Sequence, residues 1–380
     1  MIAVGLMSGT SLDGIDAAVV ELRPSAASYA LRLLRFETIP YDDALERRLR
    51  AALPPNEPTA RAICELDADV GAAFGKAAAH AARGLQVDFV ASHGQTLYHL
   101  GRRANGTGAT LQIGDAFAIR ERVGVTVAYD FRRADCAAGG EGAPLVPYVD
   151  ALLLRAHGAP RVALNLGGIA NVTLIPGDGR EVVAFDVGPG NMLLDELART
   201  RLGQPFDGGG AAAARGRADE RLVERFLADP WFAREPPKST GRERFGAHAL
   251  ADEAWGALTA EDALATAVEI AARAIADALE RQGFKGVPIM ASGGGLHNRS
   301  LVEAIARRTG TEISSCAAAG IDPDAKEAMA FAVLGYELLR ERPAGLPRVT
   351  GAAGARVLGA LAPHRLEQLL ARVRMEVEQA

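Results

Sequence analysis

The first 22 residues, MIAVGLMSGTSLDGIDAAVVEL, decide the expected fold. Apolar runs at 2–7 and 15–22 flank a small polar turn, and a third segment at 31–39 alternates imperfectly between apolar and polar residues. This pattern is typical of three β-strands joined as a meander whose first turn contains glycine. A long alanine-rich segment at 60–83 follows and predicts a helix.

The same plan recurs in the second half of the chain. Strand-like segments at 161–166, 172–175 and 181–186 surround the turn GGIAN, and a helical segment at 191–202 follows them. A meander followed by a helix, found twice, indicates a duplicated α/β fold with two lobes. The length of 380 residues also fits two lobes.

A glycine-rich loop, AAGGEGAP, marks the expected boundary between the lobes. We expect an N-terminal lobe at 1–145 and a C-terminal lobe at 146–362, with a last helix at about 363–378 that can return to the first lobe. Further helices are predicted at 263–282 and 325–342, where apolar residues recur at spacings of three and four. Both of these helices would belong to the C-terminal lobe.

The composition argues against several classes of protein. The net charge is −5 and the chain has no basic stripe, so we expect no nucleic-acid partner. No apolar run reaches the roughly 18 residues that cross a bilayer, and we expect no signal peptide. The 3 cysteines lie far apart without a CxxC pair, which argues against disulfides or a zinc site and fits the cytoplasm.

Three glycine-containing turns, each after an apolar strand, suggest a nucleotide site. Glycine lets backbone N–H groups come close to phosphates, although it also simply makes tight turns. Such turns in both halves favour a nucleotide held between two lobes, and the chain has neither a P-loop nor a dinucleotide-binding GxGxxG pattern. The predicted nucleotide-binding residues are Gly9, Thr10, Ser11, Leu12, Asp13, Gly14, Ile15, Asp16, Gly167, Gly168, Asn171, Gly293, Gly294 and Gly295.

An ordered series of motifs resembles the anhydro-N-acetylmuramic acid kinase family from residue 1 to about residue 360. The motifs are GLMSGTSLDGID (5–16), SHGQT (92–96), LQIGD (111–115), DFRRAD with AAGGEGAPLVP (130–147), LNLGGIANV (164–172), FDVGPGN (185–191), KSTGRERF (238–245), SGGGLHN (292–298) and KEAMAFA (326–332). The resemblance implies a duplicated ribonuclease H-like fold of the actin/hexokinase type, with an interlobe cleft.

The resemblance also implies an activity. Family members use ATP, Mg²⁺ and water to cleave the 1,6-anhydro bridge of anhydro-N-acetylmuramic acid and to phosphorylate O6. The products are N-acetylmuramic acid 6-phosphate and ADP, formed during cell-wall recycling. A cytoplasmic homodimer is the expected form. The alternatives are an ordinary hexose or N-acetylhexosamine kinase of the same fold, and a non-kinase actin-like ATPase.

Asp186 is the predicted catalytic base. It ends an apolar segment and precedes Gly-Pro-Gly, and strand ends are common positions for catalytic carboxylates. A helix N-cap is the alternative, but the next predicted helix begins several residues later. By resemblance, Asp186 activates the water that attacks C1, and Glu327 assists near the sugar. A favourable charge at a helix start is the alternative for Glu327.

The resemblance further implies sugar contacts from His93, Gln95, Asp130, Arg132, Lys238 and Arg242. Ordinary structural roles are the alternatives for all of them. The lactyl carboxylate of the sugar suits an arginine fork, which leaves Arg132, Arg133 and the pair Arg242 and Arg244 open. The segment 238–242 is either a solvated loop or a lid that excludes water.

Two residues depart from the family pattern. Met7 occupies the position where the wider superfamily has an aspartate that orients the metal–nucleotide complex. We therefore assign the metal-side carboxylate to Asp13, with Asp16 as the other candidate. Glu141 stands where a glutamine is expected, and it adds a negative charge near the predicted sugar site.

Overall fold

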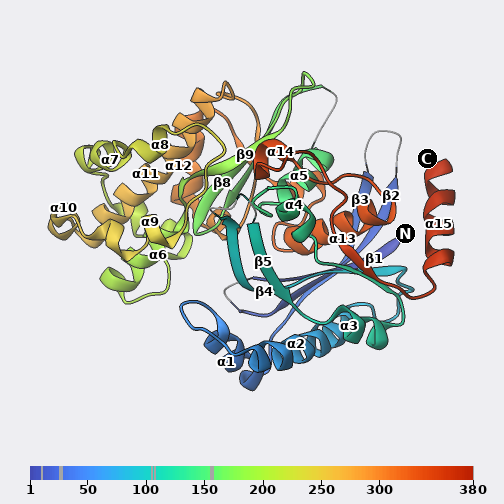
Figure 1. Ribbon diagram of the computed structural model, residues 1–380. Coiled ribbons are helices and arrows are strands. Elements are labelled where there is room, and N and C mark those ends of the chain that lie inside the picture. The colour runs from blue at the N-terminus through green and yellow to red at the C-terminus, as the bar shows by residue number, and fades with distance from the viewer. Residues whose placement is uncertain (10–11, 25–28, 104–105, 107, 155–157, 380) are drawn as a thin grey trace. The chain divides into compact units, whose positions relative to one another are not determined.

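The computed structural model describes residues 1–9, 12–24, 29–103, 106, 108–154 and 158–379 (Figure 1). The chain divides into two compact units. The first comprises Met1–Leu153 and Gly320–Ala380, and the second comprises Leu154–Ala319. The predicted limits of the C-terminal lobe, 146 and 362, were therefore wrong: residues 320–362 belong to the first unit.

A mixed sheet forms the centre of the first unit. Its strand order is β12-β6-β4-β1-β2-β3, and β5 pairs with β4. Strands β1, β2 and β3 form the predicted antiparallel meander, while β4 runs parallel to β1 and β6 parallel to β4. The bounds are Ile2–Ser8 for β1, Ile15–Pro24 for β2, Tyr29–Ile39 for β3, Phe89–Arg102 for β4, Gly108–Ile113 for β5, Thr126–Tyr129 for β6 and Ala360–Ala362 for β12.

Helices cover both faces of this sheet (Figure 1). On one face α2 (Ala60–Ala81) packs beside α3 (Ala116–Val123), and on the other α13 (Lys326–Leu339) packs against β1, β2 and β4. A Cβ on Gly5 would lie 1.8 Å from the Ala328 carbonyl oxygen, so glycine permits the close approach of α13 to β1. This packing is the physical reason that residues after 320 belong to the first unit.

The remaining helices of the first unit are shorter or peripheral. They are α1 (Asp43–Ala52), α4 (Arg133–Ala137), α5 (Val146–Leu154), α14 (Pro347–Thr350) and α15 (Leu366–Glu378). The last of them lies beside the N-terminus, where the Met1 amino group forms an ion pair with Glu376 Oε2 at 3.1 Å. The C-terminal helix thus returns to the first unit.

The sheet of the second unit repeats the plan. Its order is β11-β10-β7-β8-β9, with β7, β8 and β9 antiparallel and with β10 and β11 added in parallel. This order corresponds strand by strand to β6-β4-β1-β2-β3, which confirms the predicted duplicated ribonuclease H-like fold. The bounds are Arg161–Leu166 for β7, Ile169–Ile175 for β8, Val183–Pro189 for β9, Ile289–Ser292 for β10 and Ile313–Ser315 for β11.

Helix α11 (Ala260–Arg281) is the long helix of the second unit and contributes much of its apolar core. Thr259 caps its start by accepting the N–H of Asp262. The others are α6 (Asn191–Leu197), which continues as a π-helical turn at Ala198–Leu202, α7 (Glu220–Leu227), α8 (Pro230–Ala233), α9 (Arg242–Phe245), α10 (Glu253–Ala257) and α12 (Arg299–Thr309). Within the described ranges, no helix is both long and apolar enough to span a bilayer.

Candidate active site

Two side chains stabilise the first glycine turn, between β1 and β2, by donating hydrogen bonds to its backbone carbonyls. Ser8 Oγ donates to the Gly14 carbonyl at 2.8 Å, and Gln95 Nε2 donates to the Gly9 carbonyl at 3.2 Å. Gln95 is fully buried and also accepts a hydrogen bond from the Tyr41 hydroxyl at 3.3 Å. The predicted sugar contact from Gln95 is therefore corrected: its amide supports the turn.

Other predicted residues of this turn divide into two groups. Thr10 and Ser11 lie outside the described residues. Leu12 adopts a left-handed backbone with φ of 63°, and its side chain is buried, so it shapes the turn rather than facing a ligand. Ile15 is likewise buried, at the start of β2.

Asp16 is half-buried beside the exposed Asp13. Thr38 Oγ1 donates to Asp16 Oδ1 at 2.6 Å. Burial raises the pKa of the Asp16 carboxyl, Thr38 opposes that rise, and the negative charges of Asp13 and Asp324 add to it. Negative charge therefore accumulates beside this turn.

This turn fits Mg²⁺, although no cluster of three or more His, Cys, Asp and Glu side chains in the described ranges is arranged to hold a metal. Mg²⁺ in phosphoryl-transfer sites commonly takes one or two carboxylates together with phosphate oxygens and waters. Asp13 and Asp16 satisfy that smaller requirement.

The second glycine turn, between β7 and β8, packs on the start of α6. Gly167 accepts a hydrogen bond from the N–H of Asn191 at 2.8 Å, and Gly168 accepts one from the N–H of Met192 at 3.1 Å. Just beyond the turn, Asn171 of β8 pairs directly with Asp186 of β9. The structure thus brings a predicted phosphate-turn residue beside the predicted base.

Asp186 lies in the middle of β9 rather than at the predicted strand end, and a neighbouring segment holds its side chain. Its carboxylate oxygen Oδ2 accepts the backbone N–H of Thr240 at 2.9 Å, and its own N–H donates to the Lys238 carbonyl at 3.1 Å. The side chain is half-buried. These contacts fix the orientation of a carboxylate that stands on a rigid strand.

Lys238 has a structural role, which corrects the predicted sugar contact. Only 7% of the residue is exposed, and its Nζ donates to the Phe232 carbonyl at 2.9 Å. The ammonium also lies 4.5 Å from the centre of the Trp231 ring. Burial lowers the pKa of Lys238 to about 8, with the charge of Arg281 acting in the same direction.

The third glycine turn opens on a cavity of about 410 Å³ in the second unit. Of its three glycines, Gly294 faces this cavity: the nearest atom to a Cβ built there is 3.9 Å away. Gly293 and Gly295 instead pack closely on Leu166. The other lining residues, none of them predicted, are Asn191, Leu194, Asp195, Phe206, Asp207, Gly209, His297 and Asn298.

The motifs FDVGPGN and SGGGLHN already contained some of these residues. Asn191, His297 and Asn298 could have been found by asking which polar side chains follow the glycines. Phe206 is 59% exposed at the cavity and stands in a stretch with no recognisable pattern, so the sequence carried no signal for it.

Two predicted sugar-site residues, His93 and Asp130, line a cavity of about 480 Å³ in the first unit. The motifs SHGQT, LQIGD and DFRRAD all contribute to its lining, with Asp130 and Arg133 among the charged residues. Asp130 has a left-handed backbone and pairs with Arg133 at 3.3 Å. Burial raises the pKa of Asp130, and Arg133 opposes that rise.

His93 lines this cavity, although only 3% of the residue is exposed. Its Nε2 accepts from Arg132 Nε at 3.0 Å and its Nδ1 is 2.9 Å from the Gly94 carbonyl oxygen. Both ring nitrogens are therefore occupied within the protein. In this structure the ring positions Arg132, and the sugar contact predicted for His93 stays a prediction.

Glu327, in the first turn of α13, reaches solvent, yet the surrounding protein raises the pKa of its carboxyl. Arg132 and Lys326 oppose this rise. Lys326 itself forms a buried ion pair with Asp150 at 2.8 Å. Arg132 and Glu327, both predicted, thus belong to one electrostatic group in the first unit.

The remaining arginines differ in what they contact. Arg244 NH1 pairs with Asp229 Oδ2 at 2.6 Å, so it stabilises the second unit. The backbone of Arg242 begins α9, while its side chain lies outside the described part of the structure. Arg132 remains the arginine of the first unit that is best placed to act beside Glu327.

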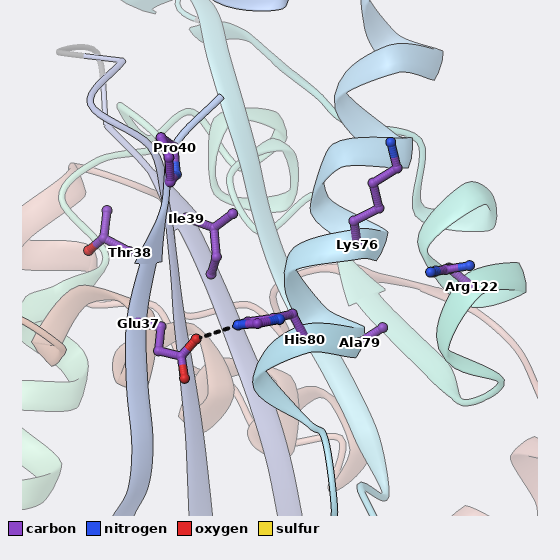
Figure 2. Close-up of a pocket in the computed structure, with 8 residues that line it drawn as sticks. All are labelled: Glu37, Thr38, Ile39, Pro40, Lys76, Ala79, His80 and Arg122. Atoms are coloured by element: carbon purple, nitrogen blue, oxygen red, sulfur yellow. Dashed lines mark ion pairs between the residues drawn. The ribbon is translucent and has the colours of Figure 1, made fainter. Parts of the chain in front are cut away.

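A further cavity of about 630 Å³ contains none of the predicted residues (Figure 2). It lies between β3 and α2, where His80 Nε2 pairs with Glu37 Oε2 at 2.8 Å. Lys76 and Arg122 line it from α2 and α3. It is separate from the glycine turns, so we assign it no part in the chemistry.

The two sheets share one order of five strands, and each has a glycine turn between the first two strands of its meander. These features define the class of ribonuclease H-like kinases and ATPases that includes actin and hexokinase. A family model described as anhydro-N-acetylmuramic acid kinase matches residues 1–364. The chain belongs to the anhydro-N-acetylmuramic acid kinase family. The predicted family and the predicted enzyme class, an ATP-dependent kinase, are confirmed.

Similar proteins cover nearly the whole chain. A protein named anhydro-N-acetylmuramic acid kinase from Xanthomonas campestris pv. campestris (strain 8004) is 47% identical over 369 residues, 95% of this chain and 97% of the relative. One of the same name from Gloeobacter violaceus is 43% identical over 375 residues, with 95% and 98% covered. Among solved structures, xylulose kinase from Rhodospirillum rubrum is 12% identical with a TM-score of 0.42 and covers 100% of this chain and 98% of its own, a likeness that carries no further argument.

Proposed function

We propose that this protein uses ATP and water to open the 1,6-anhydro bridge of anhydro-N-acetylmuramic acid and to phosphorylate O6. The products are N-acetylmuramic acid 6-phosphate and ADP, and the reaction serves cell-wall recycling. The observation that carries this proposal is the carboxylate of Asp186 on β9, whose Oδ2 accepts the N–H of Thr240 at 2.9 Å.

Asp186 acts as the general base in this reaction. Its carboxylate takes a proton from water while the water oxygen bonds to C1 of the sugar. The C1–O6 bond breaks, and O6 uses the released electron pair to attack the γ-phosphorus of ATP. ADP leaves, and one proton is released overall. Asp186 therefore serves an opening step that an ordinary hexose kinase does not need.

The nucleotide is assigned to the glycine turns and to the cavity of the second unit. Backbone N–H groups of the turns at Gly9 and at Gly167–Gly168 suit phosphate oxygens, because small residues allow close approach. The cavity beside Gly294 offers the flat, partly apolar wall of Phe206 to a nucleoside. Bound Mg²⁺, beside Asp13 and Asp16, would neutralise charge that develops on the phosphates.

The sugar is assigned to the charged residues of the first unit. Arg132 is the partner we assign to the lactyl carboxylate, since a guanidinium binds a carboxylate with two parallel hydrogen bonds. Asp130 lines a cavity from which it can accept sugar hydroxyls. We assign Arg242 a sugar contact from the family motif KSTGRERF alone.

Isotope labelling tests the reaction. The purified enzyme is incubated with the anhydro-sugar and ATP in ¹⁸O-water, and the product is analysed by mass spectrometry. The proposal expects label at the C1 hydroxyl and phosphate on O6. Phosphorylation with the bridge intact would identify an ordinary sugar kinase, and ADP release with the sugar unchanged would identify a bare ATPase.

We further propose that the enzyme works as a homodimer in the cytoplasm, as the family resemblance implies. Light scattering coupled to size-exclusion chromatography measures the mass directly. A mass near that of one 39.8 kDa chain at micromolar concentration would contradict the dimer.

A further inference from the structure

Two carboxylates line the cavity beside Gly294, and they differ in what they contact. Asp207 is buried, and its two oxygens accept the N–H groups of Ala212 and Ala213, each at 2.9 Å. Asp195 is half-buried, and no residue in the described ranges donates a hydrogen bond to its carboxylate or forms an ion pair with it. Asp207 therefore stabilises the loop around it, while Asp195 keeps both oxygens available to a ligand.

The carboxylate of Asp195 loses water on folding and gains no donor from the described part of the chain. Burial raises the pKa of this carboxyl, and the positive charge of Arg199 opposes that rise. Arg199 itself donates to Glu196 Oε2 at 3.0 Å, so its hydrogen bond goes to another side chain. An ionised carboxylate can only accept hydrogen bonds. A ligand with hydroxyl or amino hydrogens would therefore replace the water that Asp195 has lost.

Helix α6 connects this carboxylate to the second glycine turn. The N–H of Asn191, in the first turn of the helix, donates to the Gly167 carbonyl at 2.8 Å, and Asn191 also lines the cavity. Asp195 follows four residues later, on the same face of the helix and about 6 Å further along its axis. In a nucleotide the ribose adjoins the phosphates and the base lies at the far end. With the phosphates at the glycine turn, this spacing favours the ribose over the base as the group at Asp195.

We propose that Asp195 binds the 2′- and 3′-hydroxyl groups of the nucleotide ribose and thereby selects ribonucleotides, an inference that rests on the nucleotide site of the function proposed above. The two oxygens of a carboxylate accept in parallel from two donors on adjacent atoms, and the ribose is the part of ATP with such a pair. The exocyclic amine of adenine directs its two hydrogens apart, so only one of them can reach a carboxylate. Acidic side chains accept ribose hydroxyls in the same way in dinucleotide-binding folds.

Calorimetry with ADP, 2′-deoxy-ADP and 3′-deoxy-ADP in the presence of Mg²⁺ tests this proposal without the sugar. We expect the wild type to bind ADP about 10-fold more tightly than either analogue, since each analogue lacks one hydrogen bond to a charged group. Asp195→Ala should bind all three nucleotides equally, within about 2-fold, and no more tightly than the wild type binds the analogues. Because the residue binds but does not react, kcat at saturating ATP should change less than about 3-fold.

Two controls complete the design. Glu196→Gln removes the same charge from the same helix, keeps an acceptor for Arg199 and lies outside the cavity lining, so the preference for ADP should stay that of the wild type. The melting temperature of Asp195→Ala should not fall, because the substitution breaks no side-chain hydrogen bond within the described residues and alanine favours a helix.

Equal affinities of the wild type for ADP and both analogues would overturn the proposal. So would a preference for ADP that Asp195→Ala retains, which would assign the ribose to another lining side chain such as the exposed His297. A loss of kcat in Asp195→Ala with unchanged ADP affinity would contradict a role in binding. A wild-type enzyme that binds no ADP would refute the proposed nucleotide site and this inference with it, whereas unlabelled C1 would refute only the proposed sugar reaction, so the failures are distinguishable.

Discussion

Arg132 donates a hydrogen bond from Nε to His93 Nε2 across 3.0 Å, which fixes the imidazole as a neutral ring with its hydrogen on Nδ1. That hydrogen points to the Gly94 carbonyl oxygen, 2.9 Å away. Arg132 NH1 also donates to the Gly142 carbonyl at 2.9 Å. The pair therefore joins β4 to the glycine-rich loop. Burial lowers the pKa of His93 well below its usual value, and the positive charge of Arg132 lowers it further.

This lowered pKa makes stability depend on pH. Below about pH 6.5 the unfolded chain protonates His93 and the folded protein does not, so stability falls as the pH falls, by up to about 1.4 kcal/mol per pH unit. His93→Gln keeps a donor and an acceptor but cannot titrate. We expect the stability advantage of the wild type over this variant to narrow between about pH 7 and pH 5 in urea unfolding. The same change at the exposed His248 is the control, and an advantage that stays constant for His93→Gln would contradict the assignment.

The lowered pKa of Lys238 makes stability depend on pH in the alkaline range. Its pKa is lowered to about 8, so between about pH 8 and pH 10 the folded protein releases a proton that the unfolded chain keeps. Stability therefore rises with pH over this range, by up to about 1.4 kcal/mol per pH unit. Lys238→Met retains the apolar stem and cannot titrate. We expect the wild type to gain stability relative to this variant as the pH rises, and parallel curves would show that Lys238 keeps an ordinary pKa.

The sequence predicted positions along strands better than it predicted the partners of side chains. Gln95, His93 and Lys238 stand in functional motifs, yet their partners are Gly9, Arg132 and Phe232. A pattern in one segment does not show which distant backbone group will meet a side chain. The predicted lobe boundary was wrong for the same reason. The packing of α13 against Gly5 depends on residues far apart in the chain.

The two duplicated sheets carry different residues at corresponding positions, and only the second sheet carries the predicted base. In the first sheet the row that crosses β1, β2 and β3 contains Met7, Asp16 and Thr38, and in the second the corresponding row contains Asn165, Asn171 and Asp186. The duplication was visible in the sequence as a pattern of strands. Which residues occupy corresponding positions in the two sheets was not visible, because it depends on register. The register becomes known only when the strands are paired.

Asp186→Asn tests the base. The amide keeps the size and can still accept the Thr240 N–H, but it cannot take a proton from water. We expect kcat to fall by about 10²–10⁴-fold while ATP-analogue binding, measured by calorimetry, stays near the wild-type value. Full activity of this variant would remove Asp186 from the mechanism.

Asp16→Asn tests the metal side of the first turn. Removing this carboxylate should raise the Mg²⁺ concentration needed for half-maximal rate by about 10-fold, since a hard cation loses an anionic oxygen ligand. Chelation of Mg²⁺ should abolish turnover in both proteins. Asp13→Asn is the matched variant, and it decides which carboxylate lies nearer the metal. If neither variant changes the Mg²⁺ requirement, the metal is held by the phosphates and waters alone.

Gly293→Ala and Gly294→Ala separate folding from nucleotide binding at the third turn. Gly293 has φ of 89°, and a Cβ there would lie 2.8 Å from Asn165 Oδ1, so alanine should destabilise the protein by about 1–3 kcal/mol. At Gly294 the nearest atom to a new Cβ is 3.9 Å away, so the protein should fold normally and the methyl group should only narrow the cavity. We therefore expect Gly294→Ala to keep the wild-type melting temperature and to raise the KM for ATP several-fold. An unchanged KM would place the nucleoside elsewhere, because a ligand in a 410 Å³ cavity must contact a methyl group added to its wall.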